Sequence, residues 1–318
     1  MQKLYGPQVN PLARVVWGLP DSWDASIATK KSSDYICAAA WSPCSRFVAI
    51  SQSLPSRIVV LDAATLEQLH TIYSPDQYIT WKNLVYSPDG HLLTGCSYSG
   101  HHIVSWDLQT GGQVSDISIS ETMWCKSILY SGCGTMLGGL FGNETIITYN
   151  ILSGTQISSH LVQEYIYSVW ANGESLQFAT MEPGSITIWE VGFTSSHAPT
   201  QISSLPTPDH LSLENPVFFP TLSLLALILE DRVLVWDAQH QKILLDSMDI
   251  ESPKEVSFSP DGQFFICCSW GQEFHLWKKS PNGYLPHQKF TSSTEYPTVM
   301  ISPNGESIIS FHSLILHL

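Results

Sequence analysis

The sequence predicts an all-β fold built from seven copies of one four-stranded unit. Two features recur along the chain and support this prediction. The first is a tight turn of the Ser-Pro-Asp-Gly kind, which returns every 40 to 48 residues. The second is a strand that ends in a large residue, usually followed by an acid or an amide, 16 to 18 residues after the turn. Two features held in register over six copies indicate an internal repeat.

The clearest copy of the unit spans residues 256–277. Pro260 presets φ near about −65°, Asp261 can hydrogen-bond its own backbone, and Gly262 accepts the positive φ that closes the turn. Residues 264–268 are apolar and β-prone, and residues 273–277 alternate between apolar and polar. The pattern therefore predicts a strand, a turn, and two further strands.

The other copies follow the same plan. The turns lie at positions 43, 88, 132, 172, 220, 260 and 303. The strand ends that follow them are Leu61-Asp62, Trp106-Asp107, Tyr149-Asn150, Trp189-Glu190, Trp236-Asp237 and Trp277-Lys278.

A period of this length with a strand that ends in Trp-Asp resembles the WD40 repeat, which supplies the four-stranded blades of β-propellers. Trp106-Asp107 and Trp236-Asp237 keep the family dipeptide, while the other strand ends depart from it, and the Gly-His dipeptide of the family is missing. The resemblance implies a seven-bladed β-propeller over residues 36–318. We expect its blades to depend on apolar packing more than is usual in the family.

Residues 1–35 form a separate N-terminal segment that precedes the repeats. The last copy of the unit stops at Leu316-His317-Leu318, one to three residues before the expected terminal Trp. Either the last blade is incomplete, or an N-terminal strand such as Val15-Val16-Trp17 closes it, because an open sheet edge invites pairing with other chains. We favour the first alternative, a fragment truncated at its C-terminus.

The composition disfavours several classes of function. The chain has 28 acidic and 14 basic residues, a net charge of −14, and no basic cluster, which disfavours binding to nucleic acid. The longest apolar run, residues 224–229, is too short to span a membrane, and the N-terminus lacks the apolar core of a signal peptide. The seven cysteines show no Cys-x-x-Cys spacing, so we expect buried thiols in a cytoplasmic protein.

Residues 4–11 and 16–23, together with the divergent blades, resemble the WD40 regions of large fungal proteins that carry an upstream NACHT-type nucleotide-binding domain. The resemblance implies that the propeller senses or recruits a partner while the upstream domain binds nucleotide. This chain has no phosphate-binding Gly-x-x-x-x-Gly-Lys-[Ser/Thr] stretch of its own.

Two local patterns are candidates for a catalytic or a metal site. Residues 95–100 approach the Gly-x-Ser-x-Gly nucleophile elbow, but the last Gly is displaced and no helical period follows. His101 and His102 are adjacent, and on a strand adjacent side chains point to opposite faces. We therefore predict no catalytic residues, no metal site and no cofactor.

Aromatic residues precede the turns by seven or eight positions in five of the seven units. They are Tyr35, Trp81, Trp124, Tyr165 and Tyr296. They lie where the chain enters the first strand, close to one mouth of the predicted channel, and exposed rings there would bind a peptide. Offsets of seven and eight have opposite side-chain directions, so the alternative is that some or all of these rings belong to the core.

The sequence thus predicts a non-catalytic interaction or sensor module that presents a rigid face to a protein or peptide. Two other classes stay open. One is a purely structural scaffold that links the domains of a larger protein, and exposed aromatic residues on one face would argue against it. The other is an enzyme with its site in the propeller channel, which would need convergent acids or a metal.

Overall fold

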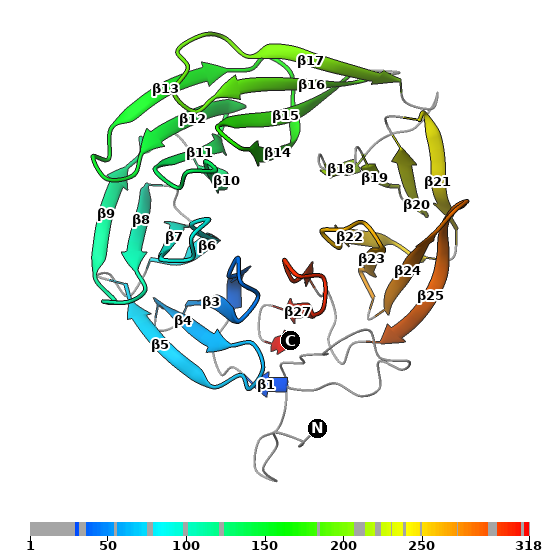
Figure 1. Ribbon diagram of the computed structural model, residues 1–318, viewed down its shortest axis with the longest axis horizontal. Helices are drawn as coiled ribbons and strands as arrows, with labels where there is room; N and C mark the ends of the chain where they lie inside the picture. The colour runs from blue at the N-terminus through cyan, green and yellow to red at the C-terminus, as the bar shows by residue number, and fades with distance from the viewer. Residues whose placement is uncertain are drawn as a thin grey trace. The chain divides into compact units, whose positions relative to one another are not determined.

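The computed structural model describes residues 29–31, 36–53, 56–74, 79–97, 101–120, 124–182, 185–206, 214–219, 224–229, 231–237, 240–248, 250–271, 273–291, 298–312 and 315–317. These residues form seven four-stranded antiparallel sheets (Figure 1). The all-β prediction is therefore confirmed. In this part of the chain no helix is long and apolar enough to cross a membrane.

Four of the sheets belong to one compact unit, which comprises Cys37–Asp62 and Glu67–Thr207. The first sheet is β2 (Ile36–Trp41), β3 (Phe47–Ser53), β4 (Ser56–Asp62) and β5 (Gln68–Tyr73). The second is β6 (Trp81–Tyr86), β7 (Leu92–Ser97), β8 (His102–Asp107) and β9 (Gln113–Ser118). The third is β10 (Cys125–Tyr130), β11 (Met136–Phe141), β12 (Thr145–Asn150) and β13 (Gln156–Leu161). The fourth is β14 (Ile166–Asn172), β15 (Ser175–Glu182), β16 (Ser185–Gly192) and β17 (Thr200–Pro206).

The remaining three sheets belong to a second unit, formed by the described residues of Pro208–Leu318 together with β1 and Ala63–Leu66. Its first sheet is β18 (Glu214–Phe219), β19 (Leu224–Ile228), β20 (Val233–Asp237) and β21 (Lys242–Ser247). The second is β22 (Pro253–Phe258), β23 (Phe264–Ser269), β24 (Glu273–Ser280) and β25 (Gly283–Thr291). The third is β26 (Thr298–Ile301), β27 (Ile308–His312), β28 (Ile315–His317) and β1 (Thr29–Lys31).

The predicted turn joins the first strand of a sheet to the second, and a serine organises it. The Ser87 hydroxyl donates to Asp89 Oδ1 at 2.6 Å and accepts the Leu92 N–H at 2.8 Å. Gly90 closes the turn with φ +75°. The turns at Ser259 and Ser302 repeat the same bonds, and those at Ser42 and Ser131 place a cysteine thiol 3.3 Å from the serine oxygen.

The strand-end residues identified from the sequence mark a repeated irregularity. In each of six sheets a β-bulge in the fourth strand falls where the third strand presents its large terminal residue. The residues beside the bulge are Leu61, Trp106, Tyr149, Trp189, Trp236 and Trp277. A bulge bends the strand and increases its twist, so the repeat in sequence corresponds to a repeat in backbone geometry.

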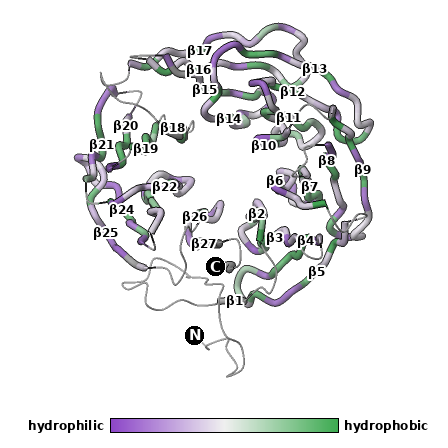
Figure 2. Tube along the Cα trace, turned by 180° about the vertical axis from the view of Figure 1, so that it is seen from behind, coloured by the Kyte–Doolittle hydropathy of each residue, from purple (hydrophilic) through white to green (hydrophobic). Residues whose placement is uncertain are grey.

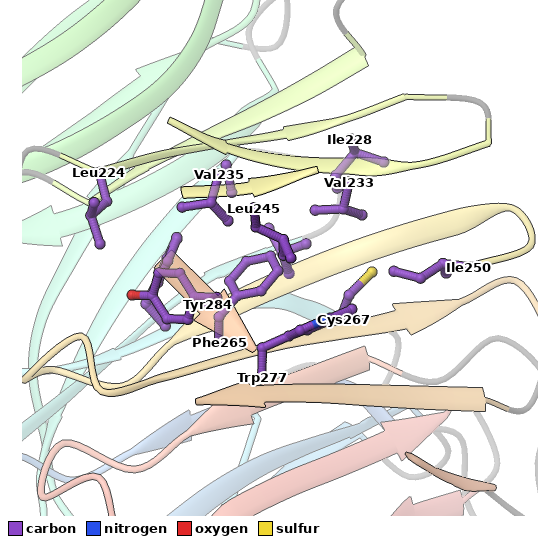
Figure 3. Close-up of a cluster of buried hydrophobic side chains, with 13 residues drawn as sticks. Leu224, Ile228, Val233, Val235, Leu245, Ile250, Phe265, Cys267, Trp277 and Tyr284 are labelled. Atoms are coloured by element: carbon purple, nitrogen blue, oxygen red, sulfur yellow. The ribbon is translucent and has the colours of Figure 1, made fainter. Parts of the chain in front are cut away.

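The core lies between sheets that follow one another in a unit. Figure 2 shows the hydrophobic colour along β19, whose five residues are all buried. Figure 3 shows side chains of β19 to β21 meeting those of β23 to β25, with Leu245, Phe265 and Trp277 among them. Phe265 is fully buried, and the Tyr284 hydroxyl donates to the Gly262 carbonyl at 2.6 Å. Large apolar rings thus stabilise the contact between these two sheets.

The last sheet is completed from the N-terminal side of the chain. Strand β1 pairs antiparallel with β28, with Thr29 opposite His317 and Lys31 opposite Ile315. Residues 15–17, predicted from the sequence as a candidate closing strand, lie outside the described residues. The strand that the structure pairs with the C-terminal hairpin is residues 29–31.

Candidate functional site

The candidate site begins with two aromatic residues at equivalent positions of neighbouring sheets. Trp124 immediately precedes β10 and Tyr165 immediately precedes β14. The first residue of each strand is paired and buried. The next residue, Lys126 in β10 and Tyr167 in β14, forms a bulge and is turned outward. The residue before the strand therefore points away from the core, and Trp124 and Tyr165 are 54% and 57% exposed.

Trp81 lies one position later in the repeat than Trp124 and Tyr165, and its environment is different. It is the first residue of β6 and pairs with Ser97. Its side chain is 1% exposed and packs edge-on against Trp106, with 4.9 Å between ring centroids and 88° between ring planes. A Cβ on Gly95 would lie only 3.0 Å from the Trp81 ring, so the glycine makes room for this pair. Trp81 is a core residue and presents no ring at the surface.

The other two aromatic residues singled out from the sequence, Tyr35 and Tyr296, lie outside the described residues. The structure therefore brings together two of the five, Trp124 and Tyr165, on the same end of two consecutive sheets.

Glu144 holds this end of the two sheets together. It sits in the three-residue β11–β12 turn between the paired residues Phe141 and Thr145, where Asn143 and Glu144 have positive φ of 62° and 54°. One carboxylate oxygen binds the Lys126 ammonium, and the other accepts the Ile166 N–H at 2.9 Å. The Glu144 carbonyl accepts the Val162 N–H at 3.0 Å. The turn of one sheet thus anchors the chain as it enters the next.

These contacts fix the exposed rings. The Lys126 ammonium lies 4.9 Å from the centre of the Tyr165 ring, and Tyr167 meets Tyr165 edge-on at 4.7 Å. The Trp124 carbonyl accepts the Gly142 N–H at 2.7 Å, and a Cβ on Gly142 would come within 3.1 Å of the indole. We call Trp124, Lys126, Glu144, Tyr165 and Tyr167 the aromatic surface. Its rings are held before any partner arrives, which lowers the entropy lost on binding.

A second exposed indole lies in the β18–β28 unit. Trp270 is 52% exposed in the β23–β24 turn, its backbone N–H donates to the Ser252 carbonyl at 2.9 Å, and Lys254 Nζ lies 5.7 Å from its ring. Lys254 occupies the bulge of β22, as Lys126 occupies that of β10. Trp270 and Tyr167 were not predicted, because neither lies seven or eight residues before a turn. The signal for Trp270 was an aromatic residue beside a glycine in a hairpin turn.

The residues weighed as catalytic or metal-binding have structural contacts. Ser97 is 2% exposed, and its hydroxyl accepts the His102 N–H at 3.2 Å. The His102 ring binds Asp116 at 2.9 Å. Across the described part of the chain, no group of three or more His, Cys, Asp or Glu side chains is placed to hold a metal ion.

Comparison with known proteins defines the class of the fold. The seven antiparallel sheets match those of a β-propeller. Residues 252–278, from the start of β22 to β24, match the family described as WD domain, G-beta repeat. No curated protein matches the chain in sequence.

Among solved structures, the chain is similar to a chain of Kuenenia stuttgartiensis Hydrazine Synthase. The likeness covers 92% of this chain and 96% of that chain at 14% identity, with a TM-score of 0.66. At this identity the likeness shows the fold alone.

Proposed function

We propose that this protein is a non-catalytic interaction module that binds a protein or peptide through its aromatic surface. Proteins with WD40 domains generally mediate protein–protein interaction or scaffolding. The observation that supports this role here is the pair of exposed rings, Trp124 and Tyr165, fixed on adjoining sheets by one carboxylate. Exposed aromatic rings with restrained conformations are typical anchors of protein interfaces.

The number of blades and the way in which the last blade is closed are part of the same proposal. We take the seven sheets as seven blades and β1 as the N-terminal strand that closes the last one, supported by the pairing of Thr29–Lys31 with β28. The resemblance to fungal NACHT-associated regions suggests an upstream nucleotide-binding domain in a longer cytoplasmic protein. In that setting the aromatic surface would receive the partner.

A peptide-display selection on the full chain tests this function. We expect selected peptides whose affinity falls at least about tenfold with Trp124→Ala, a loss of about 1.4 kcal/mol. Tyr165→Ala should act in the same direction. Tyr73→Ala is the matched control, because Tyr73 is 67% exposed on the outer strand β5. Selected peptides that bind equally well to all three variants would contradict the proposal and favour the scaffold.

A further inference from the structure

A pocket on the β22–β25 sheet is separate from the aromatic surface. It has a cavity volume of about 340 Å³, within the range of ligand sites. His275 and Trp277 of β24 form one side, with their rings stacked 5.7 Å apart at 20°. Pro286, opposite Trp277 on β25, adds a second apolar surface, and Ser247 at the end of β21 also lines the pocket. We call the space between these residues the β24–β25 pocket.

The strands that form the pocket carry a charge opposite to that of the chain. β24 and β25 contain three lysines (Lys278, Lys279 and Lys289) and a single acid, Glu273, for a net charge of +2 with neutral histidines. The whole chain has a net charge of −14. Of these lysines Lys289 lines the pocket itself, and a local positive charge on an acidic protein favours an acidic partner there over the rest of the surface.

Glu273 positions two side chains of the pocket. Its carboxylate binds Lys289 Nζ at 2.7 Å and His275 Nε2 at 3.4 Å. The hydrogen bond from Lys289 is the main cause that lowers the pKa of Glu273, so this carboxylate stays ionised. An ammonium has three N–H donors, and Lys289 is half exposed at the pocket. Lys289 can therefore remain hydrogen-bonded to Glu273 and donate to an incoming carboxylate at the same time.

We propose that the β24–β25 pocket binds an acidic side chain of a partner peptide. Its methylene groups would lie on the exposed Pro286, and its carboxylate would meet Lys289 and His287, which both line the pocket. A glutamate offers this combination of an apolar stem and an anionic end. A nucleic acid is disfavoured, because the pocket presents a single lysine and the chain as a whole repels a phosphate backbone.

The test uses the full chain and a hexaglutamate peptide carrying a neutral dye, followed by fluorescence anisotropy. Measurement at about 0.15 M salt limits long-range repulsion to a Debye length of about 8 Å. We expect hexaglutamate to bind and the uncharged hexaglutamine not to bind. Lys289→Gln should weaken hexaglutamate binding about fivefold or more, since one charge-assisted contact is lost, and Lys289→Arg should restore it.

Two variants serve as controls. Lys242→Gln removes the same charge at the opposite end of β21 from Ser247 and should change the affinity less than about twofold. Trp124→Ala should leave hexaglutamate binding unchanged, because that residue belongs to the aromatic surface. These variants therefore distinguish a failure of the pocket hypothesis from a failure of the proposal that the aromatic surface binds a partner.

Three results would overturn the inference. One is absence of hexaglutamate binding to the folded wild-type chain. Another is equal loss in Lys289→Gln and Lys242→Gln, which would show an unspecific charge effect. The third is full displacement of the peptide by free glutarate at matched carboxylate concentration, which would assign the pocket to a small dicarboxylate. Thermal melts of each variant establish that it is folded.

Discussion

Trp81 and Trp124 lie in consecutive sheets of one unit, one position apart in the repeat, and their environments are opposite. Trp81 is the first residue of β6 and is buried against Trp106, whereas Trp124 precedes β10 and is half exposed. The hydrogen-bond register explains the difference, because a shift of one residue on a strand moves a side chain to the other face. The same residue type therefore stabilises one sheet and is available for binding on the next.

The largest effect is expected from removing the buried ring. Trp81→Ala should lower the free energy of unfolding by about 3–5 kcal/mol, because it leaves a cavity beside Trp106. Trp124→Ala should change it by less than about 0.5 kcal/mol, since its ring is exposed. Urea unfolding followed by circular dichroism measures both variants.

Equal destabilisation by the two substitutions would contradict the assignment of Trp81 to the core and of Trp124 to the surface. For Trp81→Phe we expect a partial loss, smaller than that of the alanine variant, because packing of the ring is responsible.

The fold could be predicted from sequence because its signals are local. Asp89 and Gly90 form the turn through bonds within five residues, and the bulge beside Trp106 lies at a strand end visible in the sequence. Such contacts need no knowledge of distant parts of the chain. Repetition then made the strand pattern recognisable even where a unit departs from the family dipeptide.

The site could be predicted only in part because the hairpins differ in length. Trp124 lies eight residues before its turn and Tyr165 seven, yet they are structurally equivalent. In the β14–β15 hairpin Asn172 pairs directly with Ser175, so the turn is shorter than the serine turn after β10. Trp81 and Tyr165 both lie seven residues before their turns, so counting from the turn treats them as equivalent, although Trp81 is buried.

The role of Glu144 was invisible for a different reason. In the sequence it is the middle residue of a glycosylation sequon, Asn143-Glu144-Thr145. Its structural partner, the Ile166 N–H, belongs to the next sheet and is 22 residues away. No local pattern specifies a contact of this kind, which depends on how consecutive sheets pack.

An intermediate effect is expected from removing this carboxylate. Glu144→Ala leaves the Ile166 N–H and the Lys126 ammonium without their acceptor, and we expect a loss of about 1–3 kcal/mol. Hydrogen exchange should show faster exchange at the Ile166 amide, and the quenching of Tyr165 fluorescence should rise as its ring loosens.

The matched control for the Glu144 variant is Asp116→Ala. It removes a carboxylate that binds the His102 ring on the exposed surface of the same unit, and such pairs contribute about 0–1 kcal/mol. A Glu144 variant that is no more destabilised than the Asp116 variant, with unchanged exchange at Ile166, would show that the carboxylate does not anchor the two sheets.

The smallest effect on stability, and the closest test of the register argument, is expected from adding a ring at the exposed position of the second sheet. Thr80 precedes β6 as Trp124 precedes β10, and the Trp81–Ser97 pair is followed by the same bulge. Thr80→Trp should therefore place an indole on the surface and change the free energy of unfolding by about 0.5 kcal/mol or less. Oxidation by N-bromosuccinimide should find one more reactive tryptophan than in the wild type, and one fewer in Trp124→Ala. An unchanged count in the Thr80 variant, together with a large loss of stability, would mean that the new ring enters the core and that the two positions are not equivalent.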